Sequence, residues 1–521
     1  MDLSFVIRLA AHVVGLLLTS TLANVLWQKL IPRRKSEPPL VFHWLPFLGN
    51  TIAYGTDPYN FYRRCREKHG DIFTFVLLGR RMTVYLGPAG NEFILNGKVQ
   101  DVNAEDIYGP FTTPVFGSDV VYDCPNAKLM EQKKFVKFGL TQRALGAYIP
   151  LIEKEVLAYL DANFNGAAGR VNVSTVMSEI TLFTAARSLQ GAEVRDKLTA
   201  NFAELYHDLD MGFRPINFLM PWAPLPHNRR RDSAHLKMQS VYMDLINARR
   251  RAGGGKAAGN NDSDDKEPDM ISHLMTCVYK NGQVIPDKEI ANMMITLLMG
   301  GQHSSSSASA WIIHRLASQP AIAEALYQEQ LHALGPSTSP LCQGDLDRLP
   351  LLSNVIKETL RVHSSIHSLM RRATRAIPVP GTPYIIPPGR TLISSPIVSH
   401  MSAAHFPSPE TWDPHRWSHN QNQNDGPDSP EPGDAVDYGY GLTTKGTSSP
   451  YLPFGAGRHR CIGEKFAYLN LATIILTMVR NLRLGTLDGE ASVPDTDFTS
   501  LFSRPMPSAE ILWERRGSIS C

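Results

Sequence analysis

The stretch PFGAGRHRCIG at positions 453–463 has the residue types and spacing best suited to chemistry in this chain. Its glycines let the backbone fold tightly and bring N–H groups close to the sulfur of Cys461. The helix-forming run EKFAYLNLATIILTMV follows at once, so Cys461 is expected near a helix N-terminus, where the positive dipole end lowers the pKa of a thiol. The pattern predicts an ionised thiolate fixed in space, whereas a lone cysteine is more often an inert buried side chain.

A second unusual stretch, IANMMITLLMGGQHSSSSASAWIIHRL, predicts a long apolar helix over roughly 290–316. Gly300 and Gly301 in its middle each cost about 1 kcal/mol relative to alanine. The serines that follow can bond back to carbonyl groups of the preceding turn and bend the helix. The pattern predicts a place where the helix backbone approaches something bulky, beside His303, which can relay protons near neutral pH.

Two short charged motifs lie further along the chain. KETLR at 357–361 places Glu358 and Arg361 one turn apart on one helix face. DPHRW at 413–417 contributes Arg416. Taken alone, the first motif is most often an exposed ion pair that contributes little to stability.

The segment YGPFTTPVFGSDVVYD at 108–123 is apolar and aromatic, with proline and glycine breaks. Such a segment suits the wall of a pocket for a large flat lipid. Ordinary core packing explains the same composition, so the segment by itself leaves both interpretations open.

Composition excludes several classes of protein. The chain has 521 residues, of which 43% are hydrophobic and 19% charged, which fits one large enzyme fold or two to three average domains. The net charge of +3 is too small to indicate nucleic-acid binding. The six cysteines are scattered without a CxxC pair, which disfavours a disulfide framework or a zinc site and favours a reducing cytosolic environment.

The N-terminal region predicts a membrane anchor over residues 1–30. No formally charged side chain occurs from Leu9 to Trp27, a run just long enough to cross a bilayer as a helix. The basic residues that follow, against Arg8 alone in front, place the C-terminal bulk in the cytosol. A cleaved signal peptide and a buried core helix are the alternatives; the first lacks a clear cleavage site, and the Pro-rich linker over 31–45 disfavours the second. The basic residues are Lys29, Arg33, Arg34 and Lys35.

The remaining sequence predicts a mostly helical body with a minor β component. The alternating runs IFTFVLL at 72–78 and RMTVYLG at 81–87 predict a hairpin that turns near Gly79. Helical periodicity dominates from about Met130 to Leu360. The segments 251–269 and 419–437 are low in complexity and are expected to be surface loops or partly disordered.

The loop around Cys461 resembles the haem-binding signature of the cytochrome P-450 superfamily, F-x-x-G-x-[RH]-x-C-x-G. Phe454, Gly457, His459 and Gly463 occupy its other fixed positions. The resemblance implies that the Cys461 thiolate is the axial ligand of haem iron, donating electron density that favours O–O cleavage. It also implies a buried cluster of Glu358, Arg361 and Arg416, which holds the fold around the haem loop and does no chemistry.

Two further segments are similar to the sterol 14α-demethylases within that superfamily. GQHSS at 301–305 matches their central-helix element, and it places His303 and Ser304 where the superfamily usually carries an acid and a threonine. Their second marker matches 108–123 at Tyr108, Phe111, Pro114, Phe116, Gly117, Val120 and Asp123. The loop at 419–437 is like the insertions of fungal members. Ser365 stands where many relatives carry proline, which loosens the turn that enters the pocket.

The resemblance implies a set of binding residues, in which His303 and Ser304 relay protons. Donors to the haem propionates would be Tyr108, Tyr122, Lys133, Arg371 and His459, and cationic and phenolic groups suit two carboxylates. The sterol pocket would use Thr112, Phe116, Phe213, Pro215, Gly301, His303, His367, Ser368, Leu501 and Phe502.

The implied protein is a haem-thiolate monooxygenase of mainly α fold with minor β sheets, in one catalytic domain over 46–521. It would remove the 14α-methyl group of lanosterol or its 24-methylene derivative in three O2-dependent oxidations that release formate, in sterol biosynthesis. No flavin motif or GxGxxG is evident, so electrons from NADPH would arrive through a flavoprotein reductase. The expected location is the endoplasmic reticulum membrane, with azole inhibitors as ligands and no nucleic-acid partner.

Two alternatives stay open. The chain could hydroxylate another lipid, a fatty acid or a xenobiotic, which the segments 108–123 and 301–305 disfavour. It could also be a haem-containing lipid-binding or sensor protein without turnover, which intact haem-loop residues do not exclude.

Overall fold

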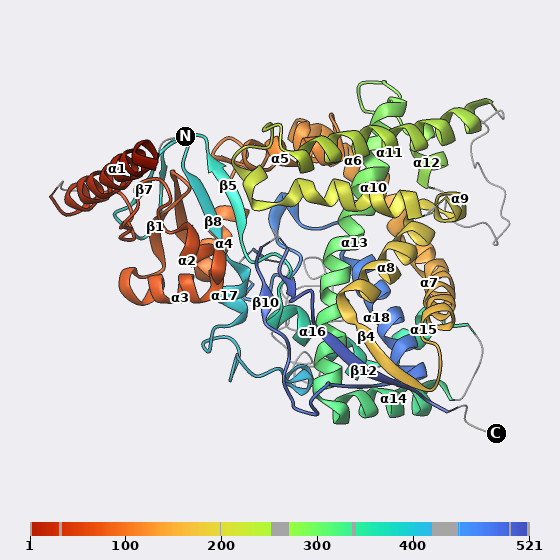
Figure 1. Ribbon diagram of the computed structural model, residues 1–521. Coiled ribbons are helices and arrows are strands. Elements are labelled where there is room, and N and C mark those ends of the chain that lie inside the picture. Colours follow the sequence, from red (N-terminus) through yellow and green to blue (C-terminus); the bar gives the residue numbers. More distant parts are fainter. Residues whose placement is uncertain are drawn as a thin grey trace. The chain divides into compact units, whose positions relative to one another are not determined.

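The computed structural model describes residues 3–30, 34–197, 200–251, 270–335, 340–418, 446–447, 449–499 and 502–517. The chain forms two compact units, each built from segments far apart in sequence (Figure 1). Unit 1 comprises Met1–Ile107, His367–Phe406 and Gly446–His459. Unit 2 comprises Tyr108–Ile366, Pro407–Lys445 and Arg460–Cys521. The domain boundaries expected from the sequence stay a prediction.

Unit 1 is organised around a five-stranded sheet of order β1-β2-β8-β5-β3. Its first two strands form the predicted hairpin, in which Ile72 pairs with Tyr85 and Leu77 with Arg80. Gly79 closes the turn at φ 75°, a left-handed conformation that glycine adopts at little cost. The strands are β1 (Ile72–Leu77), β2 (Arg80–Tyr85), β3 (Val102–Asn103), β5 (Leu369–Ala373) and β8 (Thr391–Ser394), and β6 (Ile377–Pro378) pairs with β7 (Ile385–Ile386).

Two helices of unit 1, α3 and α4, contact this sheet. Helix α4 contacts β2 and β8 and packs Ile94 and Leu95 into the apolar core beside the sheet. The helices are α1 (Leu3–Leu30), α2 (Thr51–Thr56), α3 (Pro58–His69), α4 (Gly87–Leu95), α17 (Pro396–His400) and the short η7 (Gly457–His459).

Helix α1 contains the one described segment, Ile7–Leu30, that is long and apolar enough to cross a membrane by length and composition. Its apolar side chains are largely exposed, as expected for a helix that does not belong to a soluble core. Near its end, Asn24 Nδ2 donates to the carbonyl groups of His43 and Trp44 at 2.9 and 2.8 Å. The helix is therefore a candidate membrane anchor whose last turns are tied to the start of the globular part.

Unit 2 is predominantly helical, and its longest helix, α13 (Asp287–Ser318), contacts α8, α11, α16 and α18 (Figure 1). Most α13 side chains are buried, including polar ones such as Asn292 and Gln302. The other helices are α6 (Asn126–Val136), α7 (Gln142–Asn163), α8 (Val173–Ala185), α9 (Ala192–Asp196), α10 (Ala200–Asp210), α11 (Pro226–Arg251), α12 (Met270–Thr276), α14 (Pro320–Leu334), α15 (Gln343–Leu346), α16 (Pro350–Val362) and α18 (Glu464–Asn481), while α5 (Glu105–Phe116) begins in unit 1.

The described residues of unit 2 also form two small sheets. Strand β12 (Glu510–Arg515) pairs with β4 (Ala168–Asn172) and β9 (Leu482–Gly485), and β10 (Thr496–Asp497) pairs with β11 (Arg504–Pro505). The predicted class, mainly α with minor β, is confirmed. The low-complexity segments lie outside the described residues from 252 and from 419 onward.

Candidate active site

The structure places Cys461 three residues before α18, with Gly463 at the N-cap of that helix. Cys461 is exposed to solvent as a residue. Protein atoms nevertheless surround its sulfur, and this desolvation raises the pKa of the thiol. The Gly463 N–H, Lys133 and Arg460 oppose this rise, while Glu464 adds to it. The prediction of a lowered pKa is therefore wrong for the polypeptide alone, because desolvation outweighs the N–H group and the cations.

Two cations approach this thiol from different elements of unit 2. Lys133 on α6 donates to the carbonyl group of Arg460 at 3.3 Å. Arg460 itself forms two bonds of 2.9 Å to the Glu464 carboxylate. Both cations favour the ionised form of the Cys461 thiol.

The preceding part of the loop belongs to unit 1 and is fixed by close packing. Arg458 donates to the carbonyl groups of Gly97 and Val102. His459 Nε2 lies 3.6 Å from Glu105 Oε1. Gly457 has φ +67°, and a Cβ there would overlap the carbonyl oxygen of Leu95.

We expect Gly457→Ala to lower the free energy of unfolding by about 3 kcal/mol or more, because overlap with backbone adds to left-handed strain. The matched control is Gly489→Ala, where φ is +73° and nothing lies within 4 Å, so strain alone should cost about 1–2 kcal/mol. Thermal unfolding of both variants measures the difference. Equal losses would mean that the Leu95 contact is unimportant.

The residues expected to meet a haem have the required chemistry in each unit. In unit 2, the rings of Tyr108 and Tyr122 stack with centroids 4.9 Å apart. In unit 1, Arg371 on β5 is 3% exposed and donates to the carbonyl group of Met370 at 2.7 Å, and Phe454 is half-buried. An accessible thiol with the Lys133 ammonium group near it fits a thiolate-ligated haem that carries two carboxylates.

On α13, Gly300 and Gly301 lie in an unbroken helix, and Gly300 is exposed between the buried Met299 and the half-buried Gly301. Nothing lies within 4 Å of a Cβ built on Gly300, whereas one on Gly301 would touch Leu189 at 3.4 Å. Ser304 Oγ donates to the Gly300 carbonyl group at 3.3 Å, the back-bond expected from the sequence. The helix therefore presents bare backbone at Gly300.

His303 is held by residues of α10 that no sequence pattern indicated. Its Nε2 lies 3.2 Å from Asp210 Oδ1 and 3.1 Å from the hydroxyl group of Tyr206. Its ring stacks on Phe502 at 5.2 Å between centroids. Burial lowers the pKa of His303, Asp210 opposes this shift and Arg504 adds to it. The i,i+4 spacing of Tyr206 and Asp210 was the available signal, but nothing in the sequence links it to His303.

An aromatic cluster surrounds this histidine. Phe213 contacts Phe116, Phe502 and His303 with centroids 5.8, 5.6 and 5.8 Å apart. The structure thus brings together four of the residues expected to line a sterol pocket. Of the others, Thr112 uses its hydroxyl to donate to the Tyr108 carbonyl group, Pro215 is exposed, and Leu501 lies outside the described residues.

The pocket residues expected in unit 1, His367 and Ser368, form part of a buried polar group. Ser368 Oγ contacts the hydroxyl groups of Tyr54 and Tyr62 at 3.2 and 2.8 Å, and His367 Nδ1 at 2.8 Å. Burial lowers the pKa of His367 to about 4, so its imidazole is neutral at physiological pH.

The marker segment 108–123 has a structural explanation within unit 2. The Asp123 carboxylate accepts bonds from Thr113 Oγ1 at 3.0 Å and from the Asp119 N–H at 2.9 Å. Gly117 has φ +92°, and a Cβ there would overlap the side chain of Asn292. Local geometry therefore explains two of the matches to the family marker, Gly117 and Asp123.

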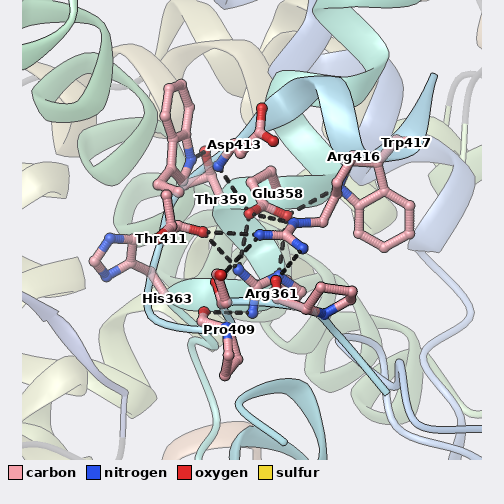
Figure 2. A network of polar contacts seen from close by, with 12 residues as sticks. Glu358, Thr359, Arg361, His363, Pro409, Thr411, Asp413, Arg416 and Trp417 are labelled. Carbon is pink, nitrogen blue, oxygen red and sulfur yellow. Dashed lines mark hydrogen bonds and ion pairs between the residues drawn. The ribbon is translucent and has the colours of Figure 1, made fainter. Parts of the chain in front are cut away.

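Glu358, Arg361 and Arg416 form a buried cluster, and Figure 2 shows both guanidinium groups converging on the carboxylate. Arg361 makes bonds of 2.8 and 2.9 Å to Glu358, and Arg416 Nε one of 2.9 Å. The indole N–H of Trp417 and the N–H of Asp413 each donate to the same carboxylate at 3.0 Å. The cluster thus joins α16 to the 407–417 loop, whose carbonyl groups take the remaining guanidinium protons (Figure 2).

Comparison with known proteins agrees with this site. The family model described as Cytochrome P450 matches residues 38–513. The chain is 61% identical over 98% of both chains to a sterol 14-alpha demethylase, cyp51A, of Aspergillus fumigatus. It is 57% identical, over 98% of both, to an eburicol 14-alpha-demethylase of Penicillium italicum.

A solved structure supports the fold alone. The retinoic acid-bound cyanobacterial CYP120A1 is 20% identical, superposes with a TM-score of 0.74, and is matched over 93% of this chain and 100% of its own. Together with a family match that spans residues 38–513 and the thiol loop at Cys461, the near-full-length identity to fungal enzymes leads to one conclusion. The chain belongs to the cytochrome P450 family and, within it, to the sterol 14-alpha demethylases.

Proposed function

We propose that this protein is a membrane-anchored monooxygenase that removes the 14α-methyl group of lanosterol or of its 24-methylene derivative, eburicol. The observation that carries the proposal is the 61% identity to a sterol 14-alpha demethylase over 98% of the chain. The eburicol-acting relative favours the 24-methylene sterol as one substrate. The aromatic cluster of Phe116, Phe213, His303 and Phe502 offers apolar surface suited to a flat lipid.

Cys461 would hold the haem iron, in a loop shaped by Phe454, Gly457 and Gly463. When bound, haem supplies an iron centre that activates O2, and a thiolate ligand favours O–O cleavage. Propionate carboxylates would accept bonds from Tyr108, Tyr122 and Lys133 in unit 2, and from Arg371 and His459 in unit 1.

His303 and Ser304 would move protons to the reacting oxygen, with Asp210 and Tyr206 behind His303. The Asp210 carboxylate favours the protonated imidazole, and the Tyr206 hydroxyl lies within bonding distance of the same nitrogen. These contacts orient one ring nitrogen, which a proton relay requires. Gly301 and the pocket residues Thr112, Pro215, His367, Ser368 and Leu501 would bound the sterol and hold its methyl group at the reacting centre.

We expect Asp210→Asn to slow sterol turnover by about 100-fold while the affinity for sterol stays near that of the wild type, because a proton-transfer group loses its charged partner. Asp208→Asn is the matched control, since Asp208 lies on the same helix and pairs with Arg230 at 3.6 Å. Turnover assays measure the rate, and spectral titration with sterol measures the affinity. Equal slowing by both substitutions would contradict a relay through Asp210.

The reaction would proceed in three oxidations at one carbon, from methyl to alcohol, alcohol to aldehyde, and then C–C cleavage. Each consumes one O2 and two electrons, and the last releases formate and leaves a 14,15 double bond. The electrons would come from NADPH through a flavoprotein reductase.

The test is incubation of the purified protein with a panel of 14α-methyl sterols, reductase and NADPH, followed by analysis of sterols and formate. The proposal predicts formate and a 14-demethylated sterol with a 14,15 double bond, together with a low-to-high-spin optical shift on sterol binding. Hydroxylated fatty acids or xenobiotics without formate would favour a different hydroxylase, and haem spectra without turnover would favour a sensor. Lipophilic azoles should give a nitrogen-ligation red shift, because their ring nitrogen can coordinate the iron beside an apolar site.

We further propose that α1 anchors the protein in the endoplasmic reticulum membrane with its catalytic part in the cytosol. The four basic residues behind the apolar run, Lys29, Arg33, Arg34 and Lys35, favour this orientation. Deletion of residues 1–30 is expected to move the protein from the membrane to the soluble fraction while the haem spectrum stays unchanged. Sedimentation and absorption spectra measure both. Loss of haem incorporation would instead assign α1 to the core.

A further inference from the structure

In the backbone between Val115 and Asp119, here called the wall segment, three carbonyl groups have side-chain partners from other helices. Helix α5 ends at Phe116, and Gly117, Asp119 and Val121 then have φ of 92°, 67° and 52°. Left-handed conformations are costly for non-glycine residues and most costly for β-branched ones, so surrounding groups must hold them. Carbonyl groups in such an irregular stretch need donors from elsewhere.

Those donors are side chains from three different helices of unit 2. His235 Nδ1 on α11 lies 3.0 Å from the carbonyl oxygen of Val115. Asn292 Nδ2 on α13 donates to the carbonyl oxygen of Ser118 at 2.9 Å. Gln132 Nε2 on α6 donates to that of Asp119 at 2.8 Å. Side chains of other helices therefore hold the wall segment where α5 ends.

Two of these donors are linked to each other by Gln239. Asn292 Oδ1 accepts a bond from Gln239 Nε2 at 2.6 Å, and the same amide nitrogen lies 3.5 Å from His235 Nε2. The roles are mutually consistent when His235 donates from Nδ1 and accepts at Nε2. We call His235, Gln239 and Asn292 the bridge.

Asn292 is the centre of the bridge. It is 0% exposed, and its amide oxygen and nitrogen each have a partner, so truncation would leave buried polar groups unsatisfied. It also packs against Gly117, where only a glycine fits. The bridge thus fixes the backbone on both sides of Phe116.

Phe116 connects the wall segment to the aromatic cluster. Its ring lies 5.8 Å from that of Phe213, which in turn contacts His303 and Phe502. A shift of the Phe116 backbone would therefore change the apolar surface next to the proton-relay histidine.

We propose that Asn292 is a positioning residue that, through the bridge, fixes Phe116 and thereby sets how tightly the sterol fits; this rests on the proposed function. Asn292 touches neither sterol nor haem in this role. Its loss should weaken sterol binding without altering the bond between haem and Cys461.

The test compares Asn292→Ala with the wild-type holoenzyme. We expect the spectral Kd for lanosterol to rise about tenfold, since at least one buried hydrogen-bonding group loses its partner. The CO band and the turnover rate at saturating sterol should stay close to wild type, so KM changes and kcat does not. Amide hydrogen exchange in peptides that cover 113–124 should become faster, which reports on the wall segment directly.

Asn91→Ala is the matched control. Asn91 in unit 1 is also 0% exposed, accepts from Ser394 Oγ at 2.6 Å and donates to Ser399 Oγ at 3.4 Å, and both of these partners belong to unit 1. Asn91→Ala should lower the free energy of unfolding about as much as Asn292→Ala does, and it should leave the Kd for lanosterol unchanged. If Asn292→Ala unfolds, Asn292→Asp keeps the shape and replaces the donor to Ser118 with an acceptor, so it should weaken binding as well.

A double substitution tests whether the bridge acts as a unit. If it does, Asn292→Ala combined with Gln239→Ala should bind sterol no more weakly than Asn292→Ala alone. An unchanged Kd in Asn292→Ala, or equal weakening in Asn91→Ala, would overturn the inference while the wild type still turns over sterol. Absence of both spin shift and formate in the wild type would instead overturn the proposed function and this inference with it.

Discussion

Replacing Cys461 with alanine is expected to abolish sterol turnover and the absorption band at about 450 nm of the reduced CO complex. The band depends on a thiolate bound to the haem iron, and an alanine methyl group cannot replace it. Difference spectra of the reduced protein with CO measure the effect.

Cys342→Ser is the matched control for this substitution. Cys342 is exposed and is the N-cap residue of the short helix α15, and serine is a preferred residue at an N-cap. Its spectrum and turnover should equal those of the wild type. A band that survives Cys461→Ala would assign the iron ligand to another residue, whereas loss of the band in Cys342→Ser would show that the readout reflects general damage.

The second large effect is expected from Glu358→Ala. This substitution should lower the free energy of unfolding by about 3–5 kcal/mol, because it leaves buried guanidinium charges without their carboxylate. The side chains of Glu358 and Arg361 are 0% exposed and that of Arg416 only 13%, so water cannot replace the carboxylate. Such a loss is a large fraction of the total stability of a typical domain, about 5–15 kcal/mol. Thermal unfolding and the yield of haem-loaded protein measure it.

The stability of Glu358→Gln should fall between those of the wild type and Glu358→Ala, because the amide keeps the shape of the side chain and one hydrogen-bond acceptor. The matched control is Glu67→Ala, which removes an exposed i,i+4 pair with Arg63 at 3.8 Å and should cost less than about 1 kcal/mol. If Glu358→Ala and Glu67→Ala unfold at the same temperature, the cluster does not hold the fold.

The sequence motif around Glu358 did not by itself predict that this carboxylate is buried. The KETLR motif alone favoured a surface ion pair, and only the resemblance to a family brought Arg416 to it. The structure explains the burial: Trp417, Asp413 and several loop carbonyl groups surround the pair and replace water as hydrogen-bonding partners. Those contacts come from residues far from Glu358 in sequence, which no local pattern encodes.

The pKa of Cys461 shows the opposite case, in which a local rule failed. The sequence correctly predicted a helix directly after the loop, and a helix N-terminus does favour a thiolate. The rise in pKa of the thiol comes from the protein packed around the sulfur, which desolvates it, and Glu464 adds to the rise. Desolvation depends on how many atoms surround a group in space, so it cannot be read from neighbours in the chain.

The sequence by itself determined the features that depend on local spacing: the hairpin at Gly79, the long helix over the Gly300-Gly301 pair, the loop that carries Cys461, and the family. Only the tertiary structure decided which side chains meet. It placed Asp210 and Tyr206 beside His303, and it assigned Asn292, His235 and Gln132 to the carbonyl groups of the wall segment. The physical reason is that backbone conformation follows from nearest neighbours, whereas burial, pairing of charges and satisfaction of polar groups follow from packing between elements distant in the chain.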